Sequence, residues 1–166
     1  MIKIALGDIC SANVDVIVNS ANTNLLAGGG VCGAIHRAAG PALEAACSPL
    51  APCPTGQAVM TPAYNLPAKY VIHAVGPRYL DGTRGEKELL ISTYEAIAEL
   101  MSHNGCKSIA IPSISTGIYR YPLSEAALIA IVTLQHRLDF DVQCTFVCYD
   151  QKTMDAYGNA LGMQQL

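Results

Sequence analysis

Two short segments hold the residue types that could bind a negatively charged ligand. In the first, Asn19–Asn24 follows an apolar run, and Gly28–Gly33 opens a run with helical character. Asparagine and glycine tolerate positive backbone angles, and three consecutive glycines let a ligand touch the backbone. Backbone N–H groups beside the start of a helix form an anion site. We therefore predict an anion cradle here, and a plain strand-to-helix connection is the alternative.

The second segment, Pro112–Pro122, follows the most apolar candidate strand and precedes a helical pattern. It contains small hydroxyl residues and one glycine, and open α/β sheets bind ligands at the carboxyl ends of their strands. Its backbone N–H groups, together with the Ser and Thr hydroxyls, are suited to grip a diphosphate. A simple connecting loop would explain Gly117 and Pro122 but not the whole run.

Two further residues follow candidate strands near the ends of the chain. Asp8 comes after the first strand, where an aspartate usually forms a turn or caps a helix. Its functional alternative is to accept a hydrogen bond from an exocyclic amine such as that of adenine. Tyr149 follows the last strand, where it either completes the core or stacks on a flat base.

Gly28, Gly30 and Gly33 match the Gly-x-Gly-x-x-Gly pattern of dinucleotide-binding proteins, but two features oppose that interpretation. The pattern should begin at the end of the strand, whereas about eight residues separate Asn19 from Gly28. The pattern also needs an acid about 20 residues further on to bind ribose, and residues 48–80 contain no Asp or Glu. We therefore do not expect a nicotinamide-dependent oxidoreductase.

The elements that must position these residues follow from the apolar pattern. Short runs rich in Val and Ile predict strands at Ile2–Leu6, Val14–Asn19, Ala58–Thr61, Tyr70–Val75, Ser108–Pro112 and Thr145–Tyr149. Helical spacing and punctuation predict helices at Gly33–Ala39, Pro41–Cys47, Glu86–His103, Leu123–Leu138 and Lys152–Leu161. This alternation predicts an α/β layered domain with a largely parallel sheet.

Composition excludes several classes of protein. The chain has 166 residues, of which 51% are hydrophobic and 14% charged, so intrinsic disorder is excluded. A single domain over residues 1–166 is expected. No stretch approaches the roughly 18 apolar residues of a membrane span, so no membrane partner is expected. Ten Lys and Arg against 13 Asp and Glu give a net charge of −3. Because the cations are scattered singly, nucleic acid is not expected as a partner.

Seven cysteines are present, an odd number with no secretory signal before them. This usage indicates a reducing, cytoplasmic location in which most thiols are buried as small apolar groups. No pair has the Cys-x-x-Cys spacing of a zinc site. We therefore expect neither a metal nor a cofactor.

Taken in order, six motifs resemble those of the macrodomain family over residues 2 to about 160. They are Gly7–Ile9, Val18–Asn22, Gly28–Gly40, Cys53–Gly56, His73–Pro77 and Ser113–Pro122. The most similar subgroup is that of the bacterial O-acetyl-ADP-ribose deacetylases and related mono-ADP-ribosyl hydrolases. The resemblance implies a three-layer α/β/α sandwich around a mixed, mostly parallel six-stranded sheet, with ADP-ribose in a cleft at its crest.

Carried over by position, the resemblance implies a role for each motif. Asp8 would hold the adenine amine, Ile9 would contact the adjoining ring edge, and Tyr149 would lie against the adenine. Asn22 would hydrogen-bond the distal ribose, where the ester or glycosidic bond sits. The two walls of the cleft would be Gly29, Gly30 and Val31 on one side and Ser115, Thr116, Gly117, Ile118 and Tyr119 on the other. His36 is expected to be structural.

Cys32 departs from that subgroup, which usually has an aspartate here to position or activate water. At pH 7 an aspartate is anionic, whereas an unperturbed thiol is mostly neutral, and losing a general base costs about 10²–10⁴ in rate. Three interpretations follow: a slow hydrolase helped by the ligand's own phosphates, a binding module that does not cleave, or a reactive thiolate at a helix start. The third would need a positive partner, for which Arg37 is the nearby candidate in sequence.

The leading hypothesis is an ADP-ribose-binding macrodomain with Asn22 and Cys32 at the reaction centre. It would hydrolyse O-acetyl-ADP-ribose or mono-ADP-ribosyl esters at the distal ribose, at a rate lowered by Cys32. The alternative is a non-catalytic reader of ADP-ribose or of ADP-ribosylated protein. The expected partners are therefore ADP-ribose, O-acetyl-ADP-ribose and mono-ADP-ribosylated proteins.

Overall fold

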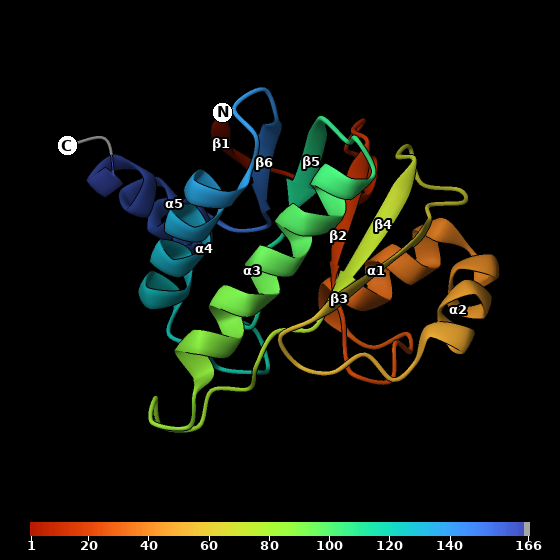
Figure 1. Cartoon of the computed structure of the whole chain (residues 1–166), viewed down its shortest axis with the longest axis horizontal. Helices are drawn as coiled ribbons and strands as arrows, with labels where there is room; N and C mark the ends of the chain where they lie inside the picture. The colour runs from red at the N-terminus through yellow and green to blue at the C-terminus, as the bar shows by residue number, and fades with distance from the viewer. Residues whose placement is uncertain (165–166) are drawn as a thin grey trace.

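A six-stranded sheet lies between two layers of helices in the computed structural model, which describes residues 1–164 (Figure 1). The strands are β1 (Ile2–Leu6), β2 (Val16–Ser20), β3 (Ala58–Pro62), β4 (Tyr70–Ala74), β5 (Ser108–Ile111) and β6 (Gln143–Cys148). The α-helices are α1 (Gly30–Ala39), α2 (Pro41–Cys47), α3 (Glu86–His103), α4 (Leu123–Arg137) and α5 (Gln151–Gln164), with short 3₁₀ turns η1 (Ile9–Ser11) and η2 (Ser48–Leu50). Every strand and helix expected from the sequence is present, and no end moves by more than three residues.

The sheet has the strand order β1-β6-β5-β2-β4-β3. All neighbouring strands are parallel except β3, which runs antiparallel to β4. The short link between β3 and β4 explains this exception, because a parallel pair needs a crossover of a dozen or more residues. The prediction of a mixed, mostly parallel sheet is confirmed, and the parallel strands all end at one edge of it.

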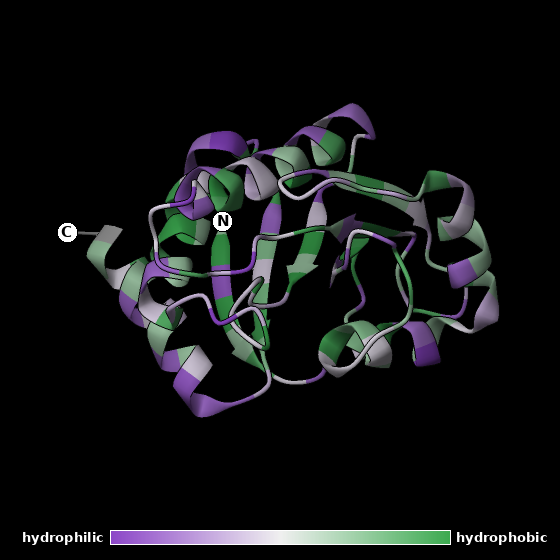
Figure 2. Ribbon diagram, turned by 90° about the horizontal axis from the view of Figure 1, so that it is seen from below, coloured by the Kyte–Doolittle hydropathy of each residue, from purple (hydrophilic) through white to green (hydrophobic). Residues whose placement is uncertain are grey.

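Both faces of the sheet are covered, which explains why its strands are continuously apolar. In β2, Val16 and Val18 pack into the larger core cluster together with residues of α3, α4 and α5. Ile17 points to the opposite face and packs with residues of α1 and α2. Figure 2, seen from below, shows the mainly hydrophobic strands between the helices. Within residues 1–164, no helix has both the length and the apolar character that crossing a membrane requires.

Three helices begin at the edge where the parallel strands end. Helix α1 begins at Gly30, three residues earlier than expected, and α4 begins directly after Pro122. Helix α5 follows Asp150, whose Oδ1 accepts a 2.8 Å hydrogen bond from the backbone N–H of Thr153. This is the bond of a helix-capping aspartate. The sheet edge therefore carries several helix N-termini, whose free N–H groups favour anions.

Candidate functional site

A cleft of about 600 Å³ opens at the carboxyl ends of β1, β2, β5 and β6. Every residue that the sequence predicted for binding or catalysis lines it: Asp8, Ile9, Asn22, Gly29–Cys32, Ser115–Tyr119 and Tyr149. Parallel strands explain how residues so far apart in sequence meet, because their carboxyl ends share one edge of the sheet.

At one end of the cleft, Asp8 and Tyr149 extend from the ends of β1 and β6. Asp8 Oδ1 accepts a 2.9 Å hydrogen bond from the backbone N–H of Cys10 and so caps η1, the structural role that an aspartate at this place often has. Its other carboxylate oxygen has no partner among the hydrogen bonds of the described residues. Tyr149 is 74% exposed, so it does not complete the core. Both groups are free to meet a flat, polar ring.

The first wall of the cleft, Gly28–Gly33, is called the glycine wall below. The N–H groups of Gly30, Val31 and Cys32 belong to the first turn of α1 and find no partner among the described residues. A Cβ built on Gly33 would lie 2.2 Å from the carbonyl oxygen of Gly28, so only glycine fits where this wall folds back on itself. At Gly28, Gly29 and Gly30 the wall therefore presents backbone to the cleft with no side chain in between.

The second wall, Ser113–Tyr121, is called the serine wall below. Hydrogen bonds from Tyr121 N to Ser115 O (2.9 Å) and from Arg120 N to Gly117 O (3.0 Å) close the loop. Among the described residues, the five consecutive backbone N–H groups from Ser115 to Tyr119 donate to no protein acceptor. Such a row of amide donors is an anion-binding concavity.

The hydroxyl groups of the serine wall, which we expected to help grip a diphosphate, face one another or the interior in this structure. Thr116 Oγ1 lies 2.6 Å from Ser113 Oγ, which also accepts a 3.0 Å hydrogen bond from the Tyr157 hydroxyl. Ser115 has a left-handed backbone (φ 68°), and its buried Oγ occupies the place that a Cβ on Gly76 would need, 2.2 Å away. This Oγ has no hydrogen-bond partner among the described residues. The Ser113 and Thr116 hydroxyls therefore hold the loop together, and the free donors in a row are those of the backbone.

Asn22 follows β2, and its side chain closes the loop that leads to the glycine wall. Its Nδ2 donates to Leu26 O (2.9 Å), and its Oδ1 accepts from Leu26 N (3.1 Å). A side-chain amide has two N–H donors and two acceptor lone pairs. One donor and one lone pair of Asn22 therefore stay available to a ligand in the cleft.

Cys32 lies in the first turn of α1, and only 7% of it is exposed. Its sulfur is 3.5 Å from Leu26 O, to which the thiol donates, and 3.8 Å from Asn19 Nδ2, from which it accepts. The contact with Leu26 O uses the thiol in its neutral form, because a thiolate has no proton to give to a carbonyl. Arg37 makes no hydrogen bond to this sulfur among the described residues, so the reactive-thiolate interpretation lacks its positive partner.

Behind Cys32, a buried chain of hydrogen bonds runs along the sheet through Asn19 and His73. Thr61 Oγ1 donates to Pro62 O (3.1 Å), so its oxygen accepts from His73 Nε2, 3.0 Å away. His73 Nδ1 then accepts from Asn19 Nδ2 at 3.1 Å, which leaves the second N–H of Asn19 for Cys32. We assign this His73 tautomer from its partners.

His73 stays uncharged at neutral pH. Burial, with a smaller contribution from the nearby ring of His36, lowers the pKa of His73 to about 4. The ring of His36 lies 6.3 Å from that of His73, and burial lowers the pKa of His36 as well. His36 is outside the lining of the cleft, which agrees with the structural role we expected for it.

The cysteines other than Cys32 serve mainly as core residues. Six of the seven are buried, and all seven are free thiols, as the sequence led us to expect. Burial raises the pKa of Cys148, at the floor of the cleft, to about 11 and that of Cys144 to about 12. Among residues 1–164, no cluster of three or more His, Cys, Asp or Glu side chains could hold a metal ion.

Sequence reasoning missed several residues that line the cleft, among them Ala34, Val147, Cys148 and Thr153. A signal for Thr153 was present, because Asp150 three residues before it has the spacing of a helix cap. Val147 and Cys148 belong to a strand that we had treated only as core. Their exposure to the cleft follows from where β6 ends in the sheet, which strand patterns do not reveal.

Comparison with known proteins agrees with this geometry. The family model described as Macro domain matches residues 18–130. A Macro domain-containing protein of Lactiplantibacillus plantarum is 51% identical over 164 residues, which cover 96% of this chain and 95% of the relative. An O-acetyl-ADP-ribose deacetylase of Escherichia fergusonii is 48% identical over 170 residues, covering 98% and 96%.

Solved structures give the same result for the fold. A mutant of the Oceanobacillus iheyensis macrodomain with ADPR has a TM-score of 0.93 at 37% identity and covers 98% of this chain and 92% of that one. The Trypanosoma brucei macrodomain in complex with ADP-ribose has a TM-score of 0.87 at 38% identity, covering 97% of this chain and 69% of that one. The three-layer α/β/α architecture predicted from the sequence is therefore confirmed.

Proposed function

Because the chain belongs to the macrodomain family, we propose that it binds ADP-ribose in the cleft and hydrolyses an ester at the distal ribose. The observation that carries the proposal is the presence of two rows of unpaired backbone N–H groups, Gly30–Cys32 and Ser115–Tyr119, in one cleft. A diphosphate between two such rows gains donors on both sides without any cationic side chain. This suits a chain whose net charge is −3.

The strand order supports one orientation of the ligand. Asp8 and Tyr149 follow β1 and β6, the serine wall follows β5, and Asn22 follows β2. Since the order along the sheet is β1-β6-β5-β2, these groups form a row along its crest. Adenine at the first pair, the diphosphate at the serine wall and the distal ribose at Asn22 would match the order of the groups in ADP-ribose.

Hydrolysis of the ester needs water to attack the acyl carbon while the bond from that carbon to the ribose oxygen breaks. The carboxylate product leaves, and the ribose oxygen takes a proton. Cys32 is not suited to accept the proton from water, because its neutral thiol donates to Leu26 O. The free N–H of Asn22 would position the ribose, and the ligand's own phosphate oxygens would accept the proton. We therefore propose that O-acetyl-ADP-ribose or mono-ADP-ribosyl esters on protein are cleaved slowly.

A non-catalytic reader of ADP-ribose or ADP-ribosylated protein is the second candidate function. The hydrogen bonds of Cys32 favour it, because they occupy the one side chain at this place that could have served as a base. Binding itself would depend on backbone N–H groups, which this thiol does not disturb. For either function we propose the cytoplasm as the location, where seven free thiols would persist.

Turnover of O-acetyl-ADP-ribose by the natural protein and by Cys32→Asp tests the proposal. We expect slow turnover by the natural protein and at least about tenfold faster turnover by Cys32→Asp, since a general base contributes about 10²–10⁴ in rate. Cys32→Ser is the matched control, because its hydroxyl can make the same bond to Leu26 O without becoming a base.

Each result separates the two candidate functions. Fast turnover by the natural protein with no gain from Cys32→Asp would show that water is activated elsewhere and that our account of position 32 is wrong. If neither protein turns over the ester but calorimetry shows that both bind ADP-ribose, the reader is the correct function. If neither binds ADP-ribose, both candidates fail.

A further inference from the structure

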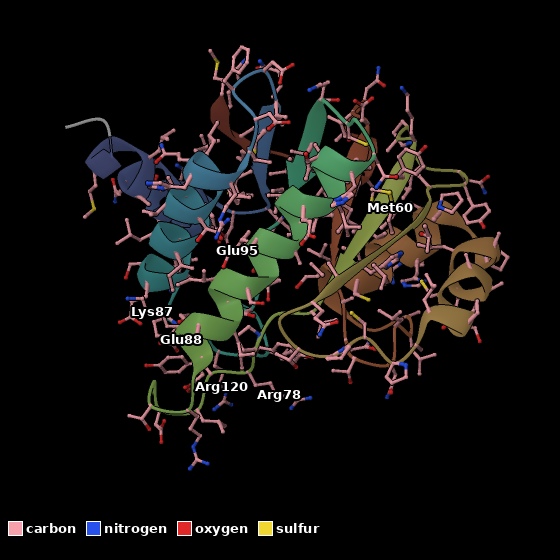
Figure 3. All side chains as sticks on the ribbon, in the orientation of Figure 1. Met60, Arg78, Lys87, Glu88, Glu95 and Arg120 are labelled. Atoms are coloured by element: carbon pink, nitrogen blue, oxygen red, sulfur yellow. The ribbon has the colours of Figure 1, made fainter. Side chains whose placement is uncertain are left out.

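Two arginines at the end of the serine wall lack an acidic partner. Arg78 and Arg120, called the arginine rim below, are both exposed. The ion pairs among the described residues use Lys69, Arg84, Lys107 and Arg137 as their cations, and neither rim arginine takes part. Figure 3 labels Arg78 and Arg120 at the same end of the molecule, below the start of α3.

Within the arginine rim, the side chain of Arg78 is held in place by Tyr119. The guanidinium carbon of Arg78 lies 4.9 Å from the centroid of the Tyr119 ring, within the range of a cation–π contact. A 2.8 Å hydrogen bond from Tyr79 N to Tyr119 O ties the two segments together, and each rim arginine is one residue away from it. A stacked guanidinium loses less conformational freedom when it binds a partner, which favours recognition.

Carboxylates do occur near the arginine rim, but none neutralises it. Burial, with added repulsion from Tyr79 and three glutamates, raises the pKa of Tyr121, the residue after Arg120, to about 12. The three are Glu125, Glu86 and Glu88. None of them forms an ion pair with Arg78 or Arg120 in the described part of the chain. Both guanidinium groups therefore remain available to an external carboxylate.

The strand order places Arg78 beyond the distal ribose. Arg78 follows β4, which neighbours β2 on the side away from β1 and β6. If adenine lies at β1 and β6 and the distal ribose at β2, the next position along the crest is that of β4. Arg120 follows β5 at the end of the serine wall, and neither arginine lines the cleft. Arg78 thus flanks the exit from which any group attached to the distal ribose would emerge, and Arg120 lies at the same end of the molecule (Figure 3).

We propose that the arginine rim binds the carboxylates of an acidic polypeptide segment that carries the ADP-ribose. This inference rests on the proposed function, because it assumes that the distal ribose is linked to a protein side chain. Arginine presents a planar fork of donors that matches a carboxylate, and such charge-assisted pairs are stronger than neutral hydrogen bonds. The preferred substrate is then an ADP-ribosyl ester within an acidic sequence. The two arginines would attract it although the net charge of this chain is −3.

The test compares two synthetic peptides of equal length that carry mono-ADP-ribose as an ester on a central glutamate. Asp and Glu flank that residue in one peptide, and Ser and Gln flank it in the other. We expect kcat/KM to be about tenfold higher for the acidic peptide. Arg78→Gln and Arg120→Gln should each lower the ratio of the two kcat/KM values about threefold, and the double variant should bring it to one. Effects of this size are expected for exposed charges that pair with carboxylates.

Three controls accompany this comparison. Turnover of O-acetyl-ADP-ribose, which has no peptide, should be unchanged in Arg78→Gln, because Arg78 belongs to neither wall of the cleft. Lys152→Gln removes a charge from the exposed start of α5, at the opposite end of the cleft, and should leave the preference for the acidic peptide intact. High salt should shrink this preference, because exposed charges are screened.

The possible outcomes separate the rim from the proposed hydrolysis. Equal kcat/KM for the two peptides would overturn the inference, and so would an equal loss on O-acetyl-ADP-ribose, which would mean that the arginines hold ADP-ribose itself. If no ester is cleaved, hydrolysis fails as a function, and calorimetry with the same peptides linked through an amide tests the rim. Tighter binding of the acidic peptide that is lost in the double variant would support the rim, and equal affinities would overturn it.

Discussion

The glycine wall and the serine wall present similar rows of backbone N–H groups but hold them in different ways. The glycine wall requires a residue without a side chain at position 33, since the carbonyl of Gly28 occupies the space that a Cβ on Gly33 would need. The serine wall depends on added hydrogen bonds, such as those of Ser113 with Thr116 and Tyr157. One wall should therefore be broken by adding a methyl group and the other should be loosened by removing a hydroxyl.

The largest effect is expected from Gly33→Ala. The new methyl group would lie 2.2 Å from a backbone oxygen that cannot move without shifting the wall. We expect a loss of about 4 kcal/mol in the free energy of unfolding, at the upper end for overpacking, and loss of ADP-ribose binding. Denaturant unfolding and calorimetry measure these two quantities.

Gly158→Ala is the matched control for this substitution. Gly158 lies in α5, and a Cβ on it would meet nothing within 4 Å. Alanine there should stabilise the protein by up to about 1 kcal/mol, because it is the better helix former. A loss below about 1 kcal/mol for Gly33→Ala would show that the glycine wall does not depend on its close backbone approach.

The second effect is a pH dependence of the free energy of unfolding, caused by His73 in the buried hydrogen-bond chain behind Cys32. The pKa of His73 is about 4 in the folded protein, compared with about 6.5 in an unfolded chain. Between these values the unfolded state binds more protons, so stability is complete above about pH 6.5 and falls as the pH drops toward 4. The full loss is about 3 kcal/mol.

Urea unfolding of the natural protein and of His73→Gln between pH 7 and pH 4.5 tests this dependence. His73→Gln should be less stable at pH 7 but lose less stability on acidification, because glutamine does not titrate. The remaining slope belongs to His36, whose pKa burial also lowers, and near pH 4.5 to carboxylates such as Glu86, whose pKa, in spite of desolvation, is lowered to about 2 by backbone hydrogen bonds. His103→Gln, an exposed position on α3, should not change the slope. Equal slopes for the natural protein and His73→Gln would contradict the assignment.

The third effect is the loss of stability expected when a methyl group is added at Gly76, where the chain passes close to the serine wall. A Cβ on Gly76 would lie 2.2 Å from Ser115 Oγ and 2.6 Å from Ile114 Cγ2. We expect Gly76→Ala to lower the free energy of unfolding by about 2–3 kcal/mol. Adding Ser115→Gly should recover part of this loss, since it removes the oxygen and suits the left-handed backbone. Strictly additive losses in this double-mutant cycle would refute the contact.

The smallest effect is expected from Thr116→Val. It removes the 2.6 Å contact with Ser113 Oγ and keeps the shape of the side chain. One lost hydrogen bond costs about 1 kcal/mol in stability. The affinity for ADP-ribose should change less than about twofold, because backbone N–H groups hold the diphosphate. A tenfold fall in affinity would mean that the hydroxyl contacts the ligand, and our account of the serine wall would be wrong.

Patterns within short stretches of sequence predicted most of the fold. In α3, Leu90, Tyr94, Ile97 and Met101 were recognised by their helical spacing, and all four are buried. The site was predictable at the level of segments, because glycine, asparagine and small hydroxyl residues after strands already favour ligand binding. Which atoms face the ligand was not predictable. The hydroxyl of Ser115 turns inward only because Gly76, far away in sequence, leaves room for it.

The chain of hydrogen bonds behind Cys32 shows the same limit. Asn19 and His73 meet because β2 and β4 pair in a register that sets them side by side. Nothing near either residue in sequence specifies that register. Without it, three interpretations of Cys32 stayed open: a slow hydrolase helped by the ligand's own phosphates, a binding module that does not cleave, or a reactive thiolate. The contact in which the thiol donates to Leu26 O favours the first two over the third.

Local patterns in the sequence were enough to predict the secondary structure, the two-sided burial of the strands and the segments that line the cleft. These follow from local periodicity and from backbone preferences of single residues. Which donors are free, how Cys32 is bonded and where Arg78 lies along the crest became visible only in the folded chain. These properties depend on strand order, register and close approach between distant residues, because hydrogen-bond partners in a folded chain are chosen by position in space.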